Sequence, residues 1–236
     1  MKDLESLYRT SWEQAPESRQ KRLYYGRLYA HLKDRIKPSG KILDVAGGPG
    51  LFLRYLEIRQ ADILDISDSG IRIASEFGYR TIKGNVEERF PFEPESYDSV
   101  TLFEVLEHLH RPNKTLAEIH NVLKPDGALY IGQPNMRPDG LIHVRRYYLK
   151  PLLDDLDKSG FKAEWVDFVP AYSMRDSIVS DIRKNKSFVR KLIQTVNLAL
   201  SYLPFNARYA MAKAWPDRFA LLFVIKAVKK PNFTRQ

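Results

Sequence analysis

Ile-Leu-Asp-Val-Ala-Gly-Gly-Pro-Gly, residues 42–50, places an apolar strand, a carboxylate and a glycine-rich turn in direct succession. Glycine lets the backbone turn tightly and brings bare N–H groups close to a ligand, while Asp44 adds a fixed acceptor at the end of the strand. The segment therefore predicts a strand, a ligand-binding turn and a helix, in that order.

Two known types of glycine-rich loop were compared with this segment, and both fit it poorly. A dinucleotide fingerprint beginning at Gly48 needs a glycine at position 53, where the chain has Leu53. A phosphate-binding P-loop needs Gly-Lys-Ser/Thr, but Leu51 and Phe52 follow Gly50. At this point a strand-to-helix turn without any ligand also remains open.

The chain of 236 residues is long enough for one large α/β domain and too short for two comfortable ones. It has no cysteine, which excludes disulfides, thiolate zinc sites and a cysteine nucleophile. The beginning of the chain lacks the apolar core of a signal peptide, and no run of about 18 apolar residues could span a bilayer. We therefore expect a cytoplasmic protein.

Strand and helix patterns alternate along most of the sequence. Residues 8–36 favour one or two aromatic-rich helices. Further helices are predicted at 49–58, 68–77, 113–123 and 149–158, and strands at 41–46, 61–67, 79–83, 97–105, 128–132, 161–169 and 219–228. This alternation implies a mostly parallel sheet with helices on both faces.

Residues 40–135 carry four motifs in the order and spacing of one known family. Asp44, Gly48 and Gly50 match the pattern Asp-x-Gly-x-Gly-x-Gly, with Ala46 in place of the first glycine. An acid at Asp65, the segment 83–88 and Glu-Val-Leu-Glu-His-Leu at 104–109 follow. Together they resemble class I S-adenosylmethionine-dependent methyltransferases, especially the O-methyltransferases of ubiquinone biosynthesis.

The resemblance implies a Rossmann-like, seven-stranded, mostly parallel sheet with an antiparallel last strand. It also divides the chain into one methyltransferase domain with four parts. These are an N-terminal helical lid at 1–37, a cofactor-binding core at 38–170, a basic helical insertion at 171–218, and the last strand and tail at 219–236.

The same resemblance implies a set of residues that bind S-adenosyl-L-methionine. A carboxylate at Asp65 suits two ribose hydroxyls, although a NAD site would also use such an acid. Asn85 and the Val86 amide suit the adenine edge, with an uncharged oxygen where the family more often has Asp. The expected cofactor-binding residues are Asp44, Ala46, Gly47, Gly48, Gly50, Asp65, Ile66, Asn85, Val86, Phe103 and Glu104.

Acceptor chemistry is expected beyond the carboxyl ends of the fourth and fifth strands. His108 and His143 are the candidate catalytic residues because imidazole titrates near neutrality, although His108 could instead cap the following helix. The candidate substrate-binding residues are Glu107, Gln133, Asn135 and Arg145. No acidic cluster in the sequence indicates magnesium, so no metal is expected.

The sequence favours a small-molecule, lipid or glycan acceptor, with O-methylation leading N-methylation. Nucleic acid is not expected as a partner, because the Asn/Asp-Pro-Pro-Tyr/Phe signature of adenine and glutamine N-methyltransferases does not follow the fourth strand. A non-catalytic S-adenosylmethionine-binding subunit remains a rival, and a NAD-dependent oxidoreductase is less favoured.

The segment 171–218 separates the sixth and seventh predicted strands and carries nine basic and three acidic residues, which is +6 of the formal net charge of +9. Within it, residues 183–205 combine a basic run with apolar residues at helical spacing. This pattern predicts peripheral contact with an anionic membrane. A lid helix packed on the sheet is the alternative.

Overall fold

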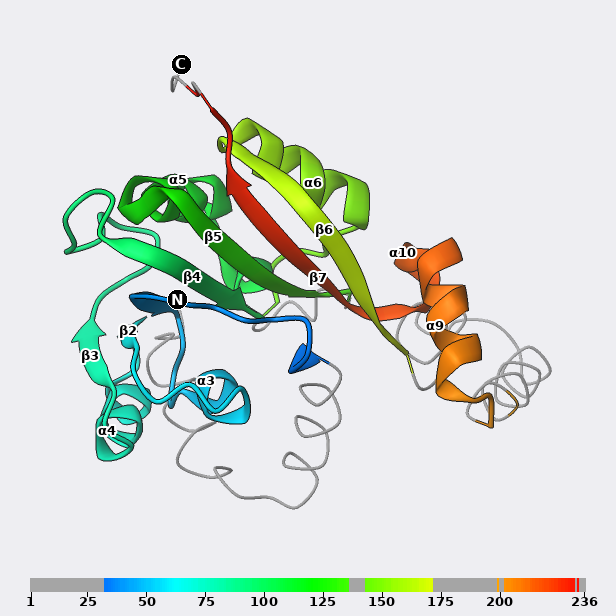
Figure 1. Ribbon diagram of the computed structural model, residues 1–236, viewed down its shortest axis with the longest axis horizontal. Coiled ribbons are helices and arrows are strands. Elements are labelled where there is room, and N and C mark those ends of the chain that lie inside the picture. Colours follow the sequence, from blue (N-terminus) through cyan, green and yellow to red (C-terminus); the bar gives the residue numbers. More distant parts are fainter. Residues whose placement is uncertain (1–31, 136–142, 172–198, 200–201, 232, 234–236) are drawn as a thin grey trace.

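The structure is a computed structural model, and it describes residues 32–135, 143–171, 199, 202–231 and 233 (Figure 1). Its centre is a seven-stranded sheet with the order β3-β2-β1-β4-β5-β7-β6. The strands are β1 (Ile42–Val45), β2 (Asp62–Asp65), β3 (Arg80–Lys83), β4 (Tyr97–Phe103), β5 (Leu123–Pro134), β6 (Phe161–Pro170) and β7 (Ala220–Lys229).

Pairings between β1 and its neighbours β2 and β4 are parallel, as are those of β2 with β3 and β4 with β5. β7 runs antiparallel to both β5 and β6. This confirms the expected mostly parallel sheet with an antiparallel last strand.

Helices cover both faces of the sheet (Figure 1). Helices α5 (Pro112–Val122) and α6 (Leu149–Lys158) bury their apolar side chains against one face, which includes Leu43 and Val45. Residues 32–36 and helix α3 (Leu51–Tyr55) pack against the other face. Because side chains alternate along a strand, β5 and β7 contribute to both cores.

The remaining short elements lie between successive strands of the sheet. Helix α4 (Asp68–Glu76) follows β2 and ends before Gly78, whose φ of 87° is the left-handed conformation expected at a helix stop. A 3₁₀ helix, η1 (Leu106–His108), follows β4. Helices α9 (Phe205–Ala214) and α10 (Pro216–Phe219) precede β7.

Two predicted elements have the wrong length. Helix α3 is shorter than the predicted 49–58, because Gly50 is the left-handed N-cap and Glu57 turns left-handed after the helix. Strand β5 is longer than the predicted 128–132. It begins at Leu123, and the register jumps from Tyr97–Leu123 to Ser99–Ala128. The sequence Lys124-Pro-Asp-Gly, which directly follows the predicted helix 113–123, thus forms an irregular part of the strand.

Most of the predicted N-terminal lid and of the insertion lies outside the described residues, as does most of the segment 183–205 that was predicted to contact a membrane. In the described part of the insertion, Tyr209 of α9 donates a hydrogen bond to Asp167 of β6. None of the described helices is long and apolar enough to cross a membrane.

Candidate functional site

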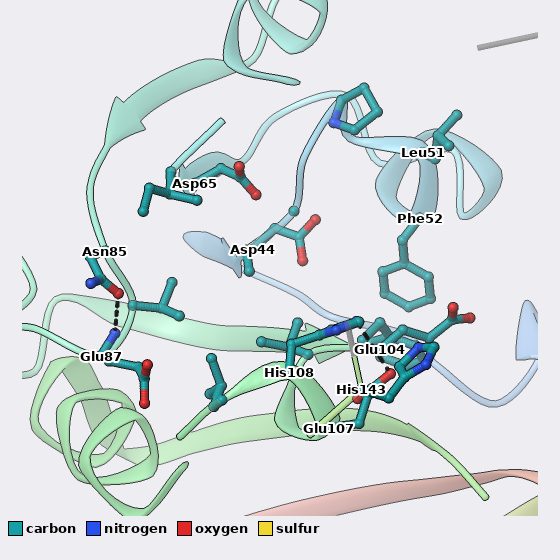
Figure 2. Close-up of a pocket in the computed structure, with 18 residues that line it drawn as sticks. Asp44, Leu51, Phe52, Asp65, Asn85, Glu87, Glu104, Glu107, His108 and His143 are labelled. Atoms are coloured by element: carbon teal, nitrogen blue, oxygen red, sulfur yellow. Dashed lines mark hydrogen bonds and ion pairs between the residues drawn. The ribbon is translucent and has the colours of Figure 1, made fainter. Parts of the chain in front are cut away.

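A cavity of about 250 Å³ lies at the carboxyl ends of β1, β2 and β4 (Figure 2). Its wall combines the turn after β1, the end of β2, the loop after β3, η1 and His143. This is the edge where ligands bind in open parallel sheets. Most of the predicted cofactor-binding residues and both candidate catalytic histidines therefore meet at one place.

The turn after β1 has left-handed backbone at Ala46, Gly48 and Gly50, with φ of 56°, 51° and 70°. An added Cβ at Gly50 would lie 2.9 Å from the Tyr79 ring, so glycine is needed there for space and for conformation. Ala46 adopts the same conformation with a side chain, which explains why the family pattern has glycine at this position.

Asp44 presents an unusual carboxylate to the cavity. Its Oδ1 accepts a hydrogen bond of 2.6 Å from Thr101, while Oδ2 is buried without a hydrogen-bond partner among the described residues. Burial raises the pKa of Asp44 to about 7; the Thr101 hydrogen bond opposes this rise and the charge of Asp65 adds to it.

The orphaned Asp44 oxygen fits the positively charged amino group of S-adenosylmethionine. A buried acceptor without a partner costs free energy, and an ammonium donor would satisfy it. The pyrophosphate of NAD would instead meet repulsion from this carboxylate. The residues present therefore fit S-adenosylmethionine better than a dinucleotide.

Asp65 has a second function that the sequence did not reveal. Its Oδ2 accepts a hydrogen bond from the Gly48 N–H at 2.8 Å, and its Oδ1 accepts one from the Ser67 N–H at 2.7 Å. Burial raises its pKa, and the backbone hydrogen bonds oppose that rise. Each oxygen keeps a lone pair for a ribose hydroxyl, so Asp65 can bind ligand while holding the turn.

Asn85 is fixed beside the cavity by its neighbours. Its Oδ1 accepts a hydrogen bond of 2.9 Å from the Glu87 N–H, and the Val86 carbonyl accepts one from Thr115. The Asn85 oxygen retains acceptor capacity for an amino group such as that of adenine. The predicted adenine-reading pair is therefore in the cavity wall and held in place.

An aromatic pair closes another side of the cavity. The Phe52 and Phe103 rings stack with centroids 3.7 Å apart and an interplanar angle of 22°. Phe103 has room because residue 132 is glycine, where an added Cβ would lie 2.1 Å from the Phe103 ring. Phe52 is not among the residues predicted from the sequence, although its place in the first turn after the glycines was a usable signal.

Most of the predicted cofactor residues line the cavity, but Gly48 and Gly50 shape the turn behind it. The wall also contains residues that were not predicted: Pro49, Leu51, Phe52, Glu87, Val105 and Leu109. These are largely apolar side chains, whose function cannot be recognised without knowing which way they face.

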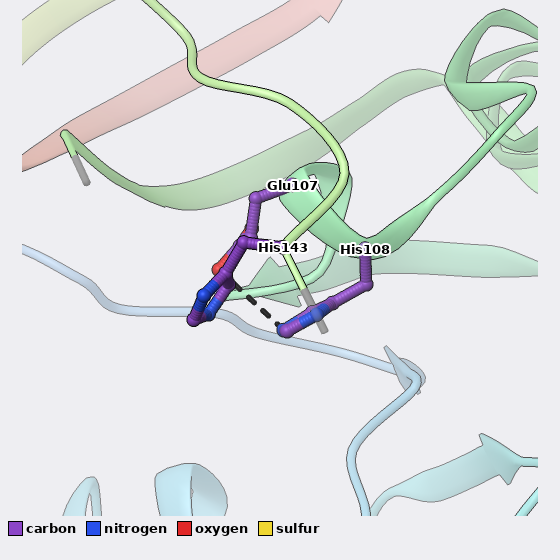
Figure 3. Close-up of side chains that lie close together, drawn as sticks. All are labelled: Glu107, His108 and His143. Carbon is purple, nitrogen blue, oxygen red and sulfur yellow. Dashed lines mark ion pairs between the residues drawn. The ribbon is translucent and has the colours of Figure 1, made fainter. Parts of the chain in front are cut away.

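Glu104, Glu107, His108 and His143 gather at the far side of the cavity (Figures 2 and 3). Glu107 Oε1 lies 3.7 Å from His108 Nε2, and the rings of His108 and His143 have centroids 4.9 Å apart. Burial raises the pKa of Glu104 to about 7 and, with a smaller contribution from the Glu104 charge, that of Glu107 to about 8. The two candidate catalytic histidines thus share one site with two acids.

Three of the four candidate substrate residues do not line the cavity, so their contact with a substrate stays a prediction. Gln133 is buried and donates a hydrogen bond of 3.1 Å to Glu107 Oε2. The Asn135 side chain donates to the carbonyls of Asp217 and Ala220, and Arg145 donates to those of Leu109 and His110. Gln133 thus orients the Glu107 side chain, and the other two side chains hold neighbouring backbone segments.

Part of the chain matches a family of known proteins. Residues 43–131 match the family described as "Methyltransferase domain". A ubiquinone biosynthesis O-methyltransferase of Saccharophagus degradans is 32% identical over 123 residues, covering 48% of this chain and 52% of that protein. A ubiquinone/menaquinone biosynthesis C-methyltransferase of Rhizobium etli is 34% identical over 116 residues, covering 44% and 45%. The chain thus spans about half the length of the curated relatives it matches.

The fold also has solved counterparts. An S-adenosylmethionine-dependent methyltransferase from Mesorhizobium loti superposes with a TM-score of 0.56 at 14% identity, covering 86% of this chain and 98% of that one. This likeness concerns the fold, while the matched sequence family and the cavity residues concern the cofactor. Residues 43–131 thus match a methyltransferase domain, and the fold and the cavity residues fit a class I S-adenosylmethionine-dependent methyltransferase.

Proposed function

We propose that this protein transfers the methyl group of S-adenosylmethionine to an oxygen atom of a small-molecule, lipid or glycan acceptor. The observation that carries the proposal is a single cavity with two different ends. Asp44, Asp65 and Asn85 line the cofactor end, and Glu107, His108 and His143 lie at the other. A methyl donor and an acceptor could therefore meet in one cavity.

The cofactor, when bound, supplies a methyl group on a positively charged sulfur. The residues of this chain would hold it by its ends: Asp44 would bind the amino group, Asp65 the ribose hydroxyls, and Asn85 with Val86 the adenine edge. The stacked rings of Phe52 and Phe103 exclude water from their side of the cavity. Such positioning can account for about 7 to 11 kcal/mol of a reaction barrier.

Oxygen is favoured as the methylated atom because a hydroxyl must lose its proton before or during transfer. Glu107, His108 and His143 supply groups that accept a proton or fix the hydroxyl, and they face the cavity together. Two relatives are named for ubiquinone biosynthesis, one as an O-methyltransferase and one as a C-methyltransferase. Hydroxylated aromatic compounds are thus the first acceptors to test.

The proposal is tested by incubating the protein with S-adenosylmethionine labelled in the methyl group and a panel of hydroxylated aromatics, glycans and lipids. We expect labelled product from a subset, and binding of S-adenosylhomocysteine but not NAD by calorimetry. Binding without transfer to any acceptor or cell-extract component would favour the rival, a non-catalytic S-adenosylmethionine-binding subunit.

A further inference from the structure

Glu107, His108 and His143 are close enough to share one ligand. One side-chain atom from each, a carboxylate oxygen and two imidazole nitrogens, lies within 4.8 Å of the other two (Figure 3). Glu107 is 3% exposed, while both histidines are partly exposed at the cavity. Three donors of these types converging on a cavity is the arrangement of a metal site with open positions.

The backbone holds the two halves of the cluster together. Glu107 and His108 belong to η1, whereas His143 comes from the segment after β5. The N–H groups of Val144 and Arg145 donate to the Glu107 carbonyl at 2.8 and 3.3 Å. The Arg145 guanidinium adds hydrogen bonds to the carbonyls that follow η1. His143 is thus attached to η1 by hydrogen bonds from both residues that follow it.

Gln133 orients the carboxylate from behind. Its Nε2 donates to Glu107 Oε2 at 3.1 Å, and its own side chain is fully buried in β5. The other carboxylate oxygen, Oε1, is the one near His108. Metal-binding carboxylates commonly have such an outer hydrogen-bond partner, which fixes the oxygen that remains for the ion.

We propose that Glu107, His108 and His143 bind one divalent metal ion at the acceptor end of the cavity. Two imidazoles and one carboxylate suit Zn²⁺ and its transition-metal neighbours, because Mg²⁺ and Ca²⁺ prefer oxygen ligands alone. This replaces the expectation, made from the sequence, that the chain has no metal site.

The ion would bind an oxygen of the acceptor, and this function rests on the proposed methyl transfer. Three protein ligands leave at least one coordination position for a small molecule. A cation also lowers the pKa of an oxygen bound to it, so a hydroxyl at this position loses its proton to solvent more readily. The acceptor class is thereby narrowed to molecules with a hydroxyl that reaches this end of the cavity.

The test is titration of the chelator-treated, full-length protein with ZnCl₂ by calorimetry, and with CoCl₂ by visible absorption. We expect one equivalent of Zn²⁺ with a micromolar or lower Kd, and the absorption bands of cobalt bound by nitrogen and oxygen. H108A, H143A and E107Q are each expected to weaken binding at least tenfold. H110A is the matched control, because His110 is exposed two residues from His108 and lies outside the cluster.

Absence of stoichiometric binding by the wild-type protein would overturn the site, as would a Kd unchanged by both H108A and H143A. Thermal unfolding in the presence of chelator shows whether each variant is folded. If E107Q does not fold, H143A still tests the site, because it removes a side chain outside the sheet. If methyl transfer persists in chelator and no metal binds, the proposed function is retained and the metal site is rejected. If metal binds but no oxygen acceptor is methylated, the metal site is retained and the proposed function is rejected.

Discussion

The Asp65 carboxylate accepts a hydrogen bond from the Gly48 N–H at 2.8 Å, so the acid at the end of β2 holds the glycine turn at the end of β1. The residue that fits the ribose is therefore also a structural support of the turn that borders the cavity. Replacing it has two separable effects.

D65A is expected to weaken S-adenosylhomocysteine binding at least 100-fold and to lower the free energy of unfolding by about 1 to 3 kcal/mol, since two backbone N–H groups lose their acceptor. D65N retains one acceptor oxygen and should lose less of both. Calorimetry and urea unfolding measure the two effects. The exposed Asp126 provides the control D126N. Cofactor affinity that is unchanged in D65A would contradict the assignment.

Asp44 should make stability depend on pH. Burial raises the pKa of Asp44 in the folded state from its ordinary value of 3.8 to about 7, so the folded state holds the proton more tightly than the unfolded state. The stabilising contribution of Asp44 to the folded state is fully present below about pH 4 and is lost as the pH rises through 7. D44N, which cannot ionise, should therefore gain stability over the wild type between pH 4 and pH 8, by at most about 4 kcal/mol.

Urea unfolding of both proteins across this pH range measures the difference. The raised pKa values of Glu104 and Glu107 act in the same direction, but they are common to both proteins and cancel. A pH-independent difference would show that the Asp44 carboxylate does not titrate in this range.

His108 and His143 are expected to matter for methyl transfer more than for cofactor binding. H108N and H143N should each slow single-turnover transfer more than tenfold, which is about 1.4 kcal/mol of barrier. Their affinity for S-adenosylhomocysteine should change less than threefold, because they lie at the acceptor end of the cavity. H110N is the control. If neither histidine variant loses tenfold, neither side chain takes part in transfer.

Gly132 should be intolerant of any side chain. An alanine Cβ would lie 2.1 Å from the Phe103 ring, so G132A must displace the ring that stacks on Phe52. We expect a loss of about 1 to 3 kcal/mol in unfolding free energy, together with weaker cofactor binding. The double variant G132A/F103L removes most of the clash and should recover part of the stability. A double variant no more stable than G132A would place the cost elsewhere.

The basic segment 183–205, most of which lies outside the described residues, is proposed to contact anionic membranes. Flotation with vesicles containing phosphatidylglycerol should show salt-sensitive binding that K184Q/K186Q/R190Q/K191Q abolishes. A control of equal charge change, R89Q/K114Q/K158Q/K162Q, alters exposed basic residues on other elements. Binding that the first set leaves unchanged, or that both sets abolish equally, would refute a specific contact through this segment.

Local sequence was sufficient for the order of the elements and for the cofactor end of the cavity. The apolar run at β1 followed by glycines, and the acid at the end of β2, are short patterns whose geometry follows from backbone sterics and from strand direction. Asp44, Asp65 and Asn85 are therefore in the positions that the motifs predicted, all of them lining one cavity.

Packing between distant segments decided the acceptor end. As expected, the fold places Gln133, Asn135 and Arg145 at or after the end of β5. The direction of each side chain, however, depends on neighbours such as Asp217 and Leu109, which no local pattern specifies. Likewise, His143 meets Glu107 only because two backbone hydrogen bonds attach its segment to η1. The sequence alone thus determined the order of the strands and helices and the residues at the cofactor end of the cavity. Tertiary contacts, which local periodicity does not encode, decided which side chains face the other end.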